Sequence, residues 1–197
     1  MKHWLKYPKL ESTSAKLIPL TIEQSDDLIA AARDGELWNL YYTSVPSPVD
    51  TENYILKAIS EYESGIAMPF AVISKTSNTI VGSTRFMNIS EDHKRLEIGS
   101  TWHASSYQRT SINTECKYLL LRYAFESLNC MAVEFRTHSY NHASRKAIER
   151  LGAKQDGILR NHRIDKSGNK RDTVVFSILD NEWKSVKNAL EFKLKQY

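Results

Sequence analysis

The chain contains few of the residues that mark linker-rich or membrane proteins. Its 197 residues include only 7 glycines and 5 prolines, which argues against long flexible linkers. No stretch approaches the roughly 18 apolar residues of a membrane span, and Met1–Ser14 has no apolar run of signal-peptide length. The net charge of +4 is too small to indicate nucleic acid as a partner. We therefore expect a single cytoplasmic domain that binds neither membrane nor nucleic acid.

Cysteine is scarce, and several common functional motifs are missing. The two cysteines, Cys116 and Cys130, cannot form a disulfide framework, and we expect buried thiols. Among the six histidines only His138 and His142 are four residues apart, and a third ligand at suitable spacing is lacking, so we expect no metal. The sequence has no Gly-x-Ser-x-Gly elbow and no Walker loop.

The segment Trp102–Glu126 is the most informative part of the chain. It is predicted to pass from a strand through a polar turn into a long apolar helix, which Thr110, Ser111 and Asn113 are suited to cap. The free N–H groups and the positive dipole end of such a helix suit a phosphate, and Arg109 adds a permanent charge. Similar residues begin many helices that bind nothing, so this segment alone leaves anion binding open.

Hydrophobic periodicity predicts a mixture of strands and helices. The expected strands are Ala15–Leu20, Phe70–Ser74, Thr79–Asn88, Leu96–His103, Ala132–Thr137, a strand at Gly157–Arg160 and a last one at Thr173–Leu179. The expected helices are Thr21–Arg33, one opening at Asp50 and Thr51, Ile112–Leu128, Asn141–Leu151 and a docked terminal helix within Asn181–Gln196. This order of elements predicts an α+β protein with a mixed sheet.

Two segments resemble the GNAT N-acetyltransferase superfamily. The turn Gln108–Asn113 is similar to its acetyl-CoA-binding loop, Gln/Arg-x-x-Gly-x-Gly/Ala, with Ser111 and Asn113 at the two small positions. Further along, Asn141 and Ser144 resemble the Asn-x-x-Ser start of the family's next helix.

The end of the chain is similar to one branch of that superfamily, the ribosomal-protein N-terminal acetyltransferases (RimJ/RimL-like). Leu151 and Gly152 resemble the Leu-Gly stop of the superfamily's helix. The residues that carry the likeness to the branch are Gly168, Arg171, Asp172, Thr173–Leu179, Glu182 and Trp183. The resemblance runs in the family's own order from about Leu17 to Trp183.

The resemblance implies the GNAT fold. This is a central mixed, mostly antiparallel twisted sheet flanked by helices, splayed between the fourth and fifth strands. We expect an N-terminal extension over residues 1–14, the N-acetyltransferase domain over 15–183 and a C-terminal helical tail over 184–197 packed on the domain.

Acetyl-CoA is the cosubstrate that the resemblance implies, without a metal. Its thioester would lie between Leu96–His103 and Ala132–Thr137, polarised by a backbone N–H near Thr101–His103. The residues expected to bind it are Trp102, His103, Arg109, Thr110, Ser111, Ile112, Asn113, Thr114, Asn141 and Ser144.

The implied reaction is direct attack of a primary amine on the thioester in a ternary complex. Glu97 is the expected general base, because strand alternation puts it with Gly99 and Thr101 on one face and Leu96, Ile98 and Trp102 on the other. Gly99 would leave room for the substrate beside the carboxylate. Asp156 is the alternative carboxylate, Ser144 the expected acid for the leaving thiolate, and Tyr140 the alternative acid. The expected acceptor-binding residues are Trp38, Tyr41, Tyr42 and Glu97.

Several alternatives stay open at this point. The acceptor amine is a protein N-terminus or a small molecule, and a homodimer is one possible assembly. A catalytically inactive CoA-binding sensor or scaffold would keep the same fold. RNA binding would use Lys117, Arg122, Arg145, Lys146 and Arg150, which we expect on solvated helix surfaces.

Overall fold

The computed structural model describes residues 4, 6–165 and 167–197, so residues 1–3 and 5 of the expected extension lie outside the described part. The strands are β1 Leu10–Glu11, β2 Ala15–Pro19, β3 Met68–Ser74, β4 Thr79–Ser90, β5 Arg95–His103, β6 Ala132–His138, β7 Lys154–Ile164 and β8 Lys170–Leu179. The α-helices are α1 Ser25–Arg33, α2 Thr51–Glu63, α3 Ile112–Arg122, α4 His142–Arg150 and α5 Asp180–Leu194. A π-helical turn, Tyr123–Ser127, extends α3.

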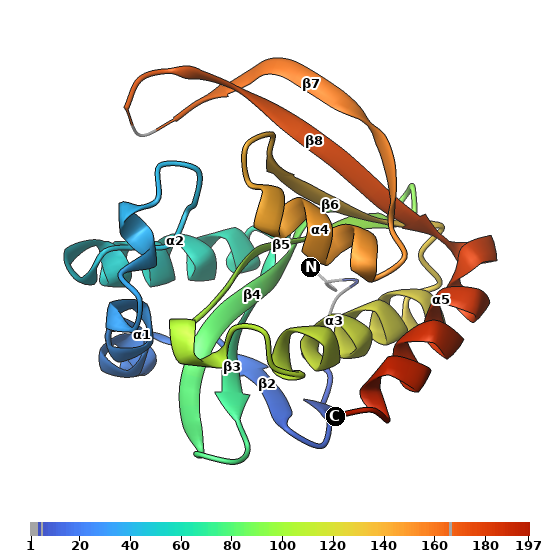
Figure 1. Cartoon of the computed structure of the whole chain (residues 1–197), viewed down its shortest axis with the longest axis horizontal. Helices are drawn as coiled ribbons and strands as arrows, with labels where there is room; N and C mark the ends of the chain where they lie inside the picture. Colours follow the sequence, from blue (N-terminus) through green and yellow to red (C-terminus); the bar gives the residue numbers. More distant parts are fainter. Residues whose placement is uncertain (1–3, 5, 166) are drawn as a thin grey trace.

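The strands form one sheet of eight, in the order β1-β2-β3-β4-β5-β6-β8-β7 (Figure 1). Only β5 and β6 pair in parallel, and the other neighbours are antiparallel, which confirms the predicted mixed sheet. The two-residue strand β1 was not predicted, because so short an edge strand has no readable alternation. It belongs to the expected extension 1–14 and pairs with β2.

The sheet opens between β5 and β6, which confirms the predicted splay. These strands pair only over Arg95–Glu97 and Ala132–Glu134, although β5 continues to His103 and β6 to His138. Counted from the first predicted strand, β2, they are the fourth and fifth strands. Glu97 is therefore the last paired residue of β5 before the strands separate.

Helices cover both faces of the sheet. Phe70 of β3 packs in a core cluster with residues of α3 and α5, such as Leu119 and Leu190, whereas the adjacent Ala71 packs in a second cluster with α1 and α2. Successive side chains of a strand point to opposite faces, so a central strand buried on both sides reads as a continuous apolar run. The terminal helix α5 packs on the domain, with Trp183 stacked on Phe125 at 5.2 Å between ring centroids.

A β-bulge in β5 overturns part of the predicted alternation. Arg85 of β4 pairs with Gly99 and Ser83 pairs with Trp102, so Thr84 alone opposes two residues, one of them Ser100. Ser100 has a φ of 46°, a left-handed conformation that accommodates the extra residue.

The bulge exchanges the two faces of the strand beyond Gly99. Leu96 and Ile98 pack in the first cluster, but Trp102 packs in the second, beneath α1 and α2. Thr101 consequently points to the α3 side, where it accepts a hydrogen bond from Lys117. The prediction that Trp102 shares a face with Leu96, and Thr101 a face with Glu97, is therefore wrong.

Candidate active site

A cleft of about 800 Å³ lies where β5 and β6 separate. Its walls come from the segment 37–45, β5, the turn 108–113, β6, α4 and the β7–β8 hairpin. Figure 1 shows this hairpin as a long arm whose tip lies on the same side of the molecule as the segment between α1 and α2. Elements distant in sequence thus meet around one opening in the sheet.

The turn before α3 lines one end of the cleft through Gln108, Arg109, Thr110 and Asn113. Ser111 is the helix N-cap but makes no capping hydrogen bond, because its hydroxyl donates to Glu115 Oε1 at 2.7 Å instead. Ile112 N donates to Thr110 Oγ1 at 3.4 Å, but the N–H groups that follow it lack the serine cap, which leaves them suited to an anion. Among the predicted cofactor residues, Ser111, Ile112 and Thr114 do not line the cleft with their side chains, and the last two are buried.

His103 joins the end of β5 to this helix. Its Nε2 lies 3.3 Å from Asn113 Oδ1, and both residues line the cleft. Burial, reinforced by the charge of Lys117, lowers the pKa of His103 to about 4. The imidazole is therefore neutral at physiological pH. Trp102, another of the expected cofactor-binding residues, also lines the cleft, although from the opposite face of β5 to the one expected.

The start of α4 brings Asn141 and Ser144 to the same cleft. Asn141 is the N-cap, and its Oδ1 accepts a hydrogen bond from Ser144 N at 3.0 Å. Asn141 therefore both caps the helix and lines the cleft. Tyr140, the alternative acid, is 65% exposed and does not line the cleft.

The expected acceptor-binding aromatics divide into two groups. Tyr41 and Tyr42 line the cleft, and their rings lie edge to face at 5.1 Å between centroids. Tyr41 also meets the ring of His138 at 5.7 Å. Trp38, in contrast, does not line the cleft and packs against the core cluster beneath α1 and α2.

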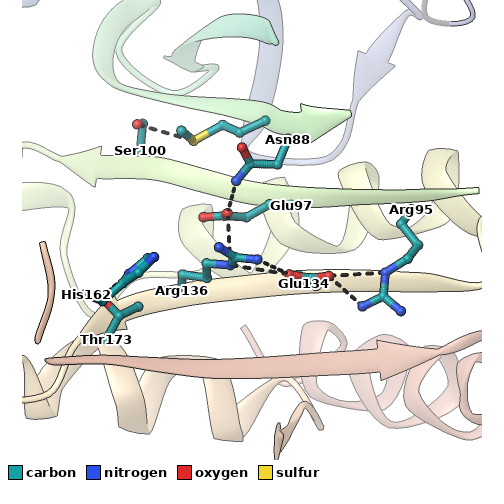
Figure 2. A network of polar contacts seen from close by, with 9 residues as sticks. Asn88, Arg95, Glu97, Ser100, Glu134, Arg136, His162 and Thr173 are labelled. Carbon is teal, nitrogen blue, oxygen red and sulfur yellow. Dashed lines mark hydrogen bonds and ion pairs between the residues drawn. The ribbon is translucent and has the colours of Figure 1, made fainter. Parts of the chain in front are cut away.

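Glu97 lies in the cleft at the point where the sheet opens, within a polar network (Figure 2). Its Oε2 accepts a hydrogen bond from Asn88 Nδ2 at 2.7 Å and lies 3.6 Å from Arg136 Nε. Its Oε1 is beside Gly99, where an added Cβ would be 2.8 Å away. Burial raises the pKa of Glu97 although Asn88 and Arg136 act to lower it. A buried carboxyl with a raised pKa suits a general base or acid.

Glu134, the register partner of Glu97 on β6, has the opposite character. It accepts hydrogen bonds from Arg95 Nη2 at 2.5 Å and from Arg136 Nη2 at 2.9 Å (Figure 2). Burial acts to raise the pKa of Glu134, but these hydrogen bonds prevail and lower it. Two neighbouring carboxyls whose pKa values move apart are typical of a site in which one group transfers protons and the other stays charged.

Sequence reasoning placed Lys117 on a solvated helix surface, and this prediction is wrong. The side chain is buried, lines the cleft from α3 and donates to Thr101 Oγ1 at 2.6 Å. Burial lowers the pKa of Lys117 to about 7. Leu120 and Leu121, three and four residues along the helix, would have placed position 117 on the buried side, but its charged side chain suggested solvent.

Three other residues at the site were not anticipated from sequence. Asn88 and Arg136 contact Glu97, and His138 contacts the tyrosines, although none of them belongs to a recognisable motif. Asp156, the alternative carboxylate, is exposed, accepts a hydrogen bond from Ser177 Oγ at 2.9 Å and lies outside the cleft lining.

Comparison with known proteins identifies the family. The acetyltransferase (GNAT) domain matches residues 15–154. The chain belongs to the GNAT acetyltransferase family. A GCN5-related N-acetyltransferase from Brucella melitensis is 31% identical, with a TM-score of 0.85 over 96% of this chain and 86% of that one. An uncharacterized N-acetyltransferase, p20, from Bacillus licheniformis is 25% identical over 83% of this chain and 92% of its own length.

More distant structures share the fold of this GNAT protein. The ribosomal-protein-S5-alanine acetyltransferase from Vibrio fischeri is 15% identical, with a TM-score of 0.72 over 90% of this chain and 99% of that one. The microcin C7 self-immunity acetyltransferase MccE, solved with acetyl-CoA and AMP, is 17% identical, with a TM-score of 0.74 over 85% and 93%. The resemblance to GNAT acetyltransferases is thus confirmed. Within the described residues, no helix is both long and apolar enough to cross a membrane.

Proposed function

We propose that this GNAT protein transfers the acetyl group of acetyl-CoA to a primary amine by direct attack in a ternary complex. The observation that carries the proposal is the position of Glu97, a buried carboxyl with a raised pKa at the point where β5 and β6 separate. An opening between strands exposes backbone N–H groups that can polarise a thioester carbonyl. A base at the same point can receive the amine proton.

Support for acetyl-CoA comes from the turn and from the family. The turn 108–113 presents Arg109 and the start of α3 at one end of the cleft, which suits a diphosphate. MccE, a protein of the same fold, has been solved with acetyl-CoA bound. The pantetheine arm would extend from this turn past Asn141 and Ser144 toward Glu97, all of which line one cleft.

In this proposal each residue has a defined task. Glu97 Oε1 accepts a proton from the amine, through water, while Oε2 stays anchored by Asn88 and Arg136. A backbone N–H near the β5 bulge polarises the thioester carbonyl, and Ser144 protonates the departing thiolate. Tyr41, Tyr42 and Glu97 contact the acceptor. Because the acyl group passes directly to nitrogen, neither buried cysteine is needed as a nucleophile.

Thiol release from acetyl-CoA tests the reaction. The panel of acceptors comprises peptides with free N-termini, amino acids, polyamines and aminoglycoside-like amines, with chemical detection of free CoA. Turnover with an amine, and none without one, is the expected result. Calorimetry should give clear binding of CoA and much weaker binding of dephosphorylated pantetheine, because the latter lacks the diphosphate.

The second candidate, a CoA-binding sensor or scaffold, is favoured by Ser111 and Asn113, which replace the small residues of the family's loop. Tight CoA binding without thiol release for any amine would support it and contradict the proposed enzyme. Equal affinity for CoA and pantetheine would instead show that the turn 108–113 does not bind the diphosphate.

A further inference from the structure

Two arginines face each other across the β7–β8 hairpin, on the wall of the cleft. Arg163 and Arg171 are register partners in this antiparallel pair, and both line the cleft. Like charges directly opposite each other on neighbouring strands disfavour the pairing. Neither guanidinium forms an ion pair with a carboxylate of the residues that the structure describes. Burial and the charge of Arg163 lower the pKa of Arg171, and the charge of Asp165 opposes them. The pair thus presents two guanidinium groups to the cleft with no carboxylate in direct ion-pair contact among the described residues.

Two acidic residues of the same hairpin, Asp165 and Asp172, accept hydrogen bonds from backbone N–H groups. Asp165 Oδ1 accepts hydrogen bonds from the backbone N–H groups of Ser167 and Asn169, both at 2.8 Å, within the hairpin turn. Asp172 Oδ1 accepts a hydrogen bond from the backbone N–H of Asn161 at 2.8 Å. The third arginine of this wall, Arg136, is paired with Glu134 and Glu97.

The arginine charges act on the pKa values of two histidines that line the cleft, His138 and His162. Burial and then the charge of Arg171 lower the pKa of His138, although Asp165 and Asp172 oppose them. Burial and then the charge of Arg163 lower the pKa of His162. At both histidines the charge of one arginine of the pair acts in the same direction as burial.

One arginine of the pair, Arg163, also acts on the proposed base. The charge of Arg163 is one of the influences that lower the pKa of Glu97. Because Glu97 and both arginines line the same cleft, an acceptor whose nitrogen meets Glu97 can carry an anionic group to the arginines. The opposite end of the cleft, with Arg109 and the start of α3, would be occupied by the CoA diphosphate and is a separate anion site.

We propose that Arg163 and Arg171 bind an anionic group, a carboxylate or a phosphate, carried by the amine acceptor close to its reacting nitrogen. This inference rests on the proposed function, since it specifies the acceptor of the same site. Guanidinium groups bind carboxylate and phosphate oxygens in a bidentate manner, and an anion between them removes their mutual repulsion. Acceptors with additional positive charges, such as polyamines, are disfavoured by the same field.

Matched acceptor pairs test the proposal. Glycylglycine and glycylglycinamide differ by one carboxylate, and phosphoethanolamine and ethanolamine differ by one phosphate. The first pair therefore tests recognition of a carboxylate, and the second tests recognition of a phosphate. We expect kcat/KM to fall about 10-fold or more for the anionic member of at least one pair in Arg163→Gln, Arg171→Gln and the double variant. The neutral member should change less than about 2-fold. Comparing each variant with the parent on the same acceptor removes differences in amine basicity.

The matched control is Arg160→Gln, because Arg160 is exposed on β7 and does not line the cleft. It should leave both members of each pair unchanged. Arg171→Glu should reverse the preference toward a cationic acceptor. The proposal is overturned if the parent treats both members of each pair alike, or if its preference for the anionic member persists in the double variant. Equal losses on both members would also overturn it.

A binding measurement separates this proposal from the proposed function. Inorganic phosphate is titrated into the protein saturated with CoA, so that the diphosphate site is already filled. Saturable binding that weakens about 10-fold or more in the double variant supports the arginine site even if no amine is acetylated. If phosphate does not bind and the parent shows no preference between matched acceptors, the arginine site is contradicted. Thiol release with neutral amines would in that case still support the proposed acetyltransferase.

Discussion

Asn88 Nδ2 donates to Glu97 Oε2 at 2.7 Å, and an irregularity in the β4–β5 ladder makes this contact possible. Met87 pairs with Glu97, and Ser90 pairs with Arg95. Two residues of β4 lie between these paired positions and only one residue of β5, so β4 contains one extra residue. Asn88 has a φ of 47°, a conformation that asparagine tolerates better than most residues. The bulge turns the amide of Asn88 toward the carboxylate that we propose as the base.

Glu97→Gln should remove the acidic limb of the pH–rate profile and reduce kcat by about 10²-fold or more, because glutamine is isosteric but cannot accept the proton. Steady-state rates across pH, with saturating acetyl-CoA, measure this. Glu182→Gln is the matched control, since Glu182 pairs with Lys154 and does not line the cleft. A raised KM with an unchanged pH profile would reduce Glu97 to an amine-binding charge and leave proton transfer to solvent.

Asn88→Ala should move that acidic limb to higher pH. The hydrogen bond from Asn88 favours the charged carboxylate and acts to lower the pKa of Glu97, so its loss raises the pKa further. The base is then deprotonated only at higher pH, and kcat/KM falls most on the acidic side. Asn39→Ala, which removes an exposed amide that donates to Glu36 at 3.1 Å, should leave the limb in place. An unshifted limb in Asn88→Ala would mean that Glu97 is not the group being titrated.

Gly99→Ala should lower kcat about 10-fold while leaving CoA affinity unchanged. A Cβ at this position would lie 2.7 Å from Met87 Sδ and 2.8 Å from Glu97 Oε1, so the carboxylate or the thioether must move. Calorimetry with CoA and rates at saturating acetyl-CoA separate the two effects. Gly157→Ala is the control, because an added Cβ there meets nothing within 4 Å. Equal activity of the two variants would indicate that Glu97 tolerates displacement.

Most of the fold could be predicted because it follows from local patterns. Apolar residues at helical spacing and alternating strands gave the order of elements, and the resemblance to a known family gave the position of the splay. The bulges at Asn88 and Ser100 could not be predicted in this way. Each places a non-glycine residue at positive φ, which no local pattern in these segments suggests. The predicted alternation of side chains along β5 as far as Trp102 is wrong for this reason.

Part of the cleft lining could be anticipated from the sequence. Arg109, Asn113, Asn141 and Ser144 belong to the segments that resemble the family, and all four line the cleft. The network around Glu97 could not be foreseen, because Arg136 and Glu134 come from β6 and meet Glu97 only through a pairing distant in sequence. Such non-local contacts have no signature in a single sequence.

Ser144→Ala should lower kcat about 10-fold with little change in stability, if its hydroxyl protonates the leaving thiolate. The capping hydrogen bond uses the backbone N–H of Ser144, so it survives the substitution. Turnover per folded enzyme and the urea midpoint together measure the two effects. Ser185→Ala, at an exposed position of α5, is the matched control. Lower stability with unchanged turnover would show that Ser144 has no role as an acid.

Lys117→Met should stabilise the protein at neutral pH, with a gain that disappears as the pH rises. Burial lowers the pKa of Lys117 from 10.5 to about 7, so the unfolded chain binds one more proton than the folded protein between these values. Stability of the parent consequently increases with pH across this window, and the cost of the buried lysine is greatest below pH 7. Methionine fills a similar space without a charge. Thr101 Oγ1 retains its contact with Thr84 Oγ1 at 2.7 Å after the lysine donor is lost.

Urea unfolding at several pH values from 6.5 to 10.5 checks this expectation, using ~1 pH unit steps to follow the linkage slope. The difference in unfolding free energy between Lys117→Met and the parent should shrink steadily toward the alkaline end. Lys184→Met, at an exposed position of α5, should give a difference that is small and independent of pH. A constant difference for Lys117→Met would mean that this lysine titrates alike in both states, which contradicts its burial against Thr101. The prediction therefore tests the burial of Lys117, which sequence reasoning assigned to solvent and which the structure buries in the wall of the cleft.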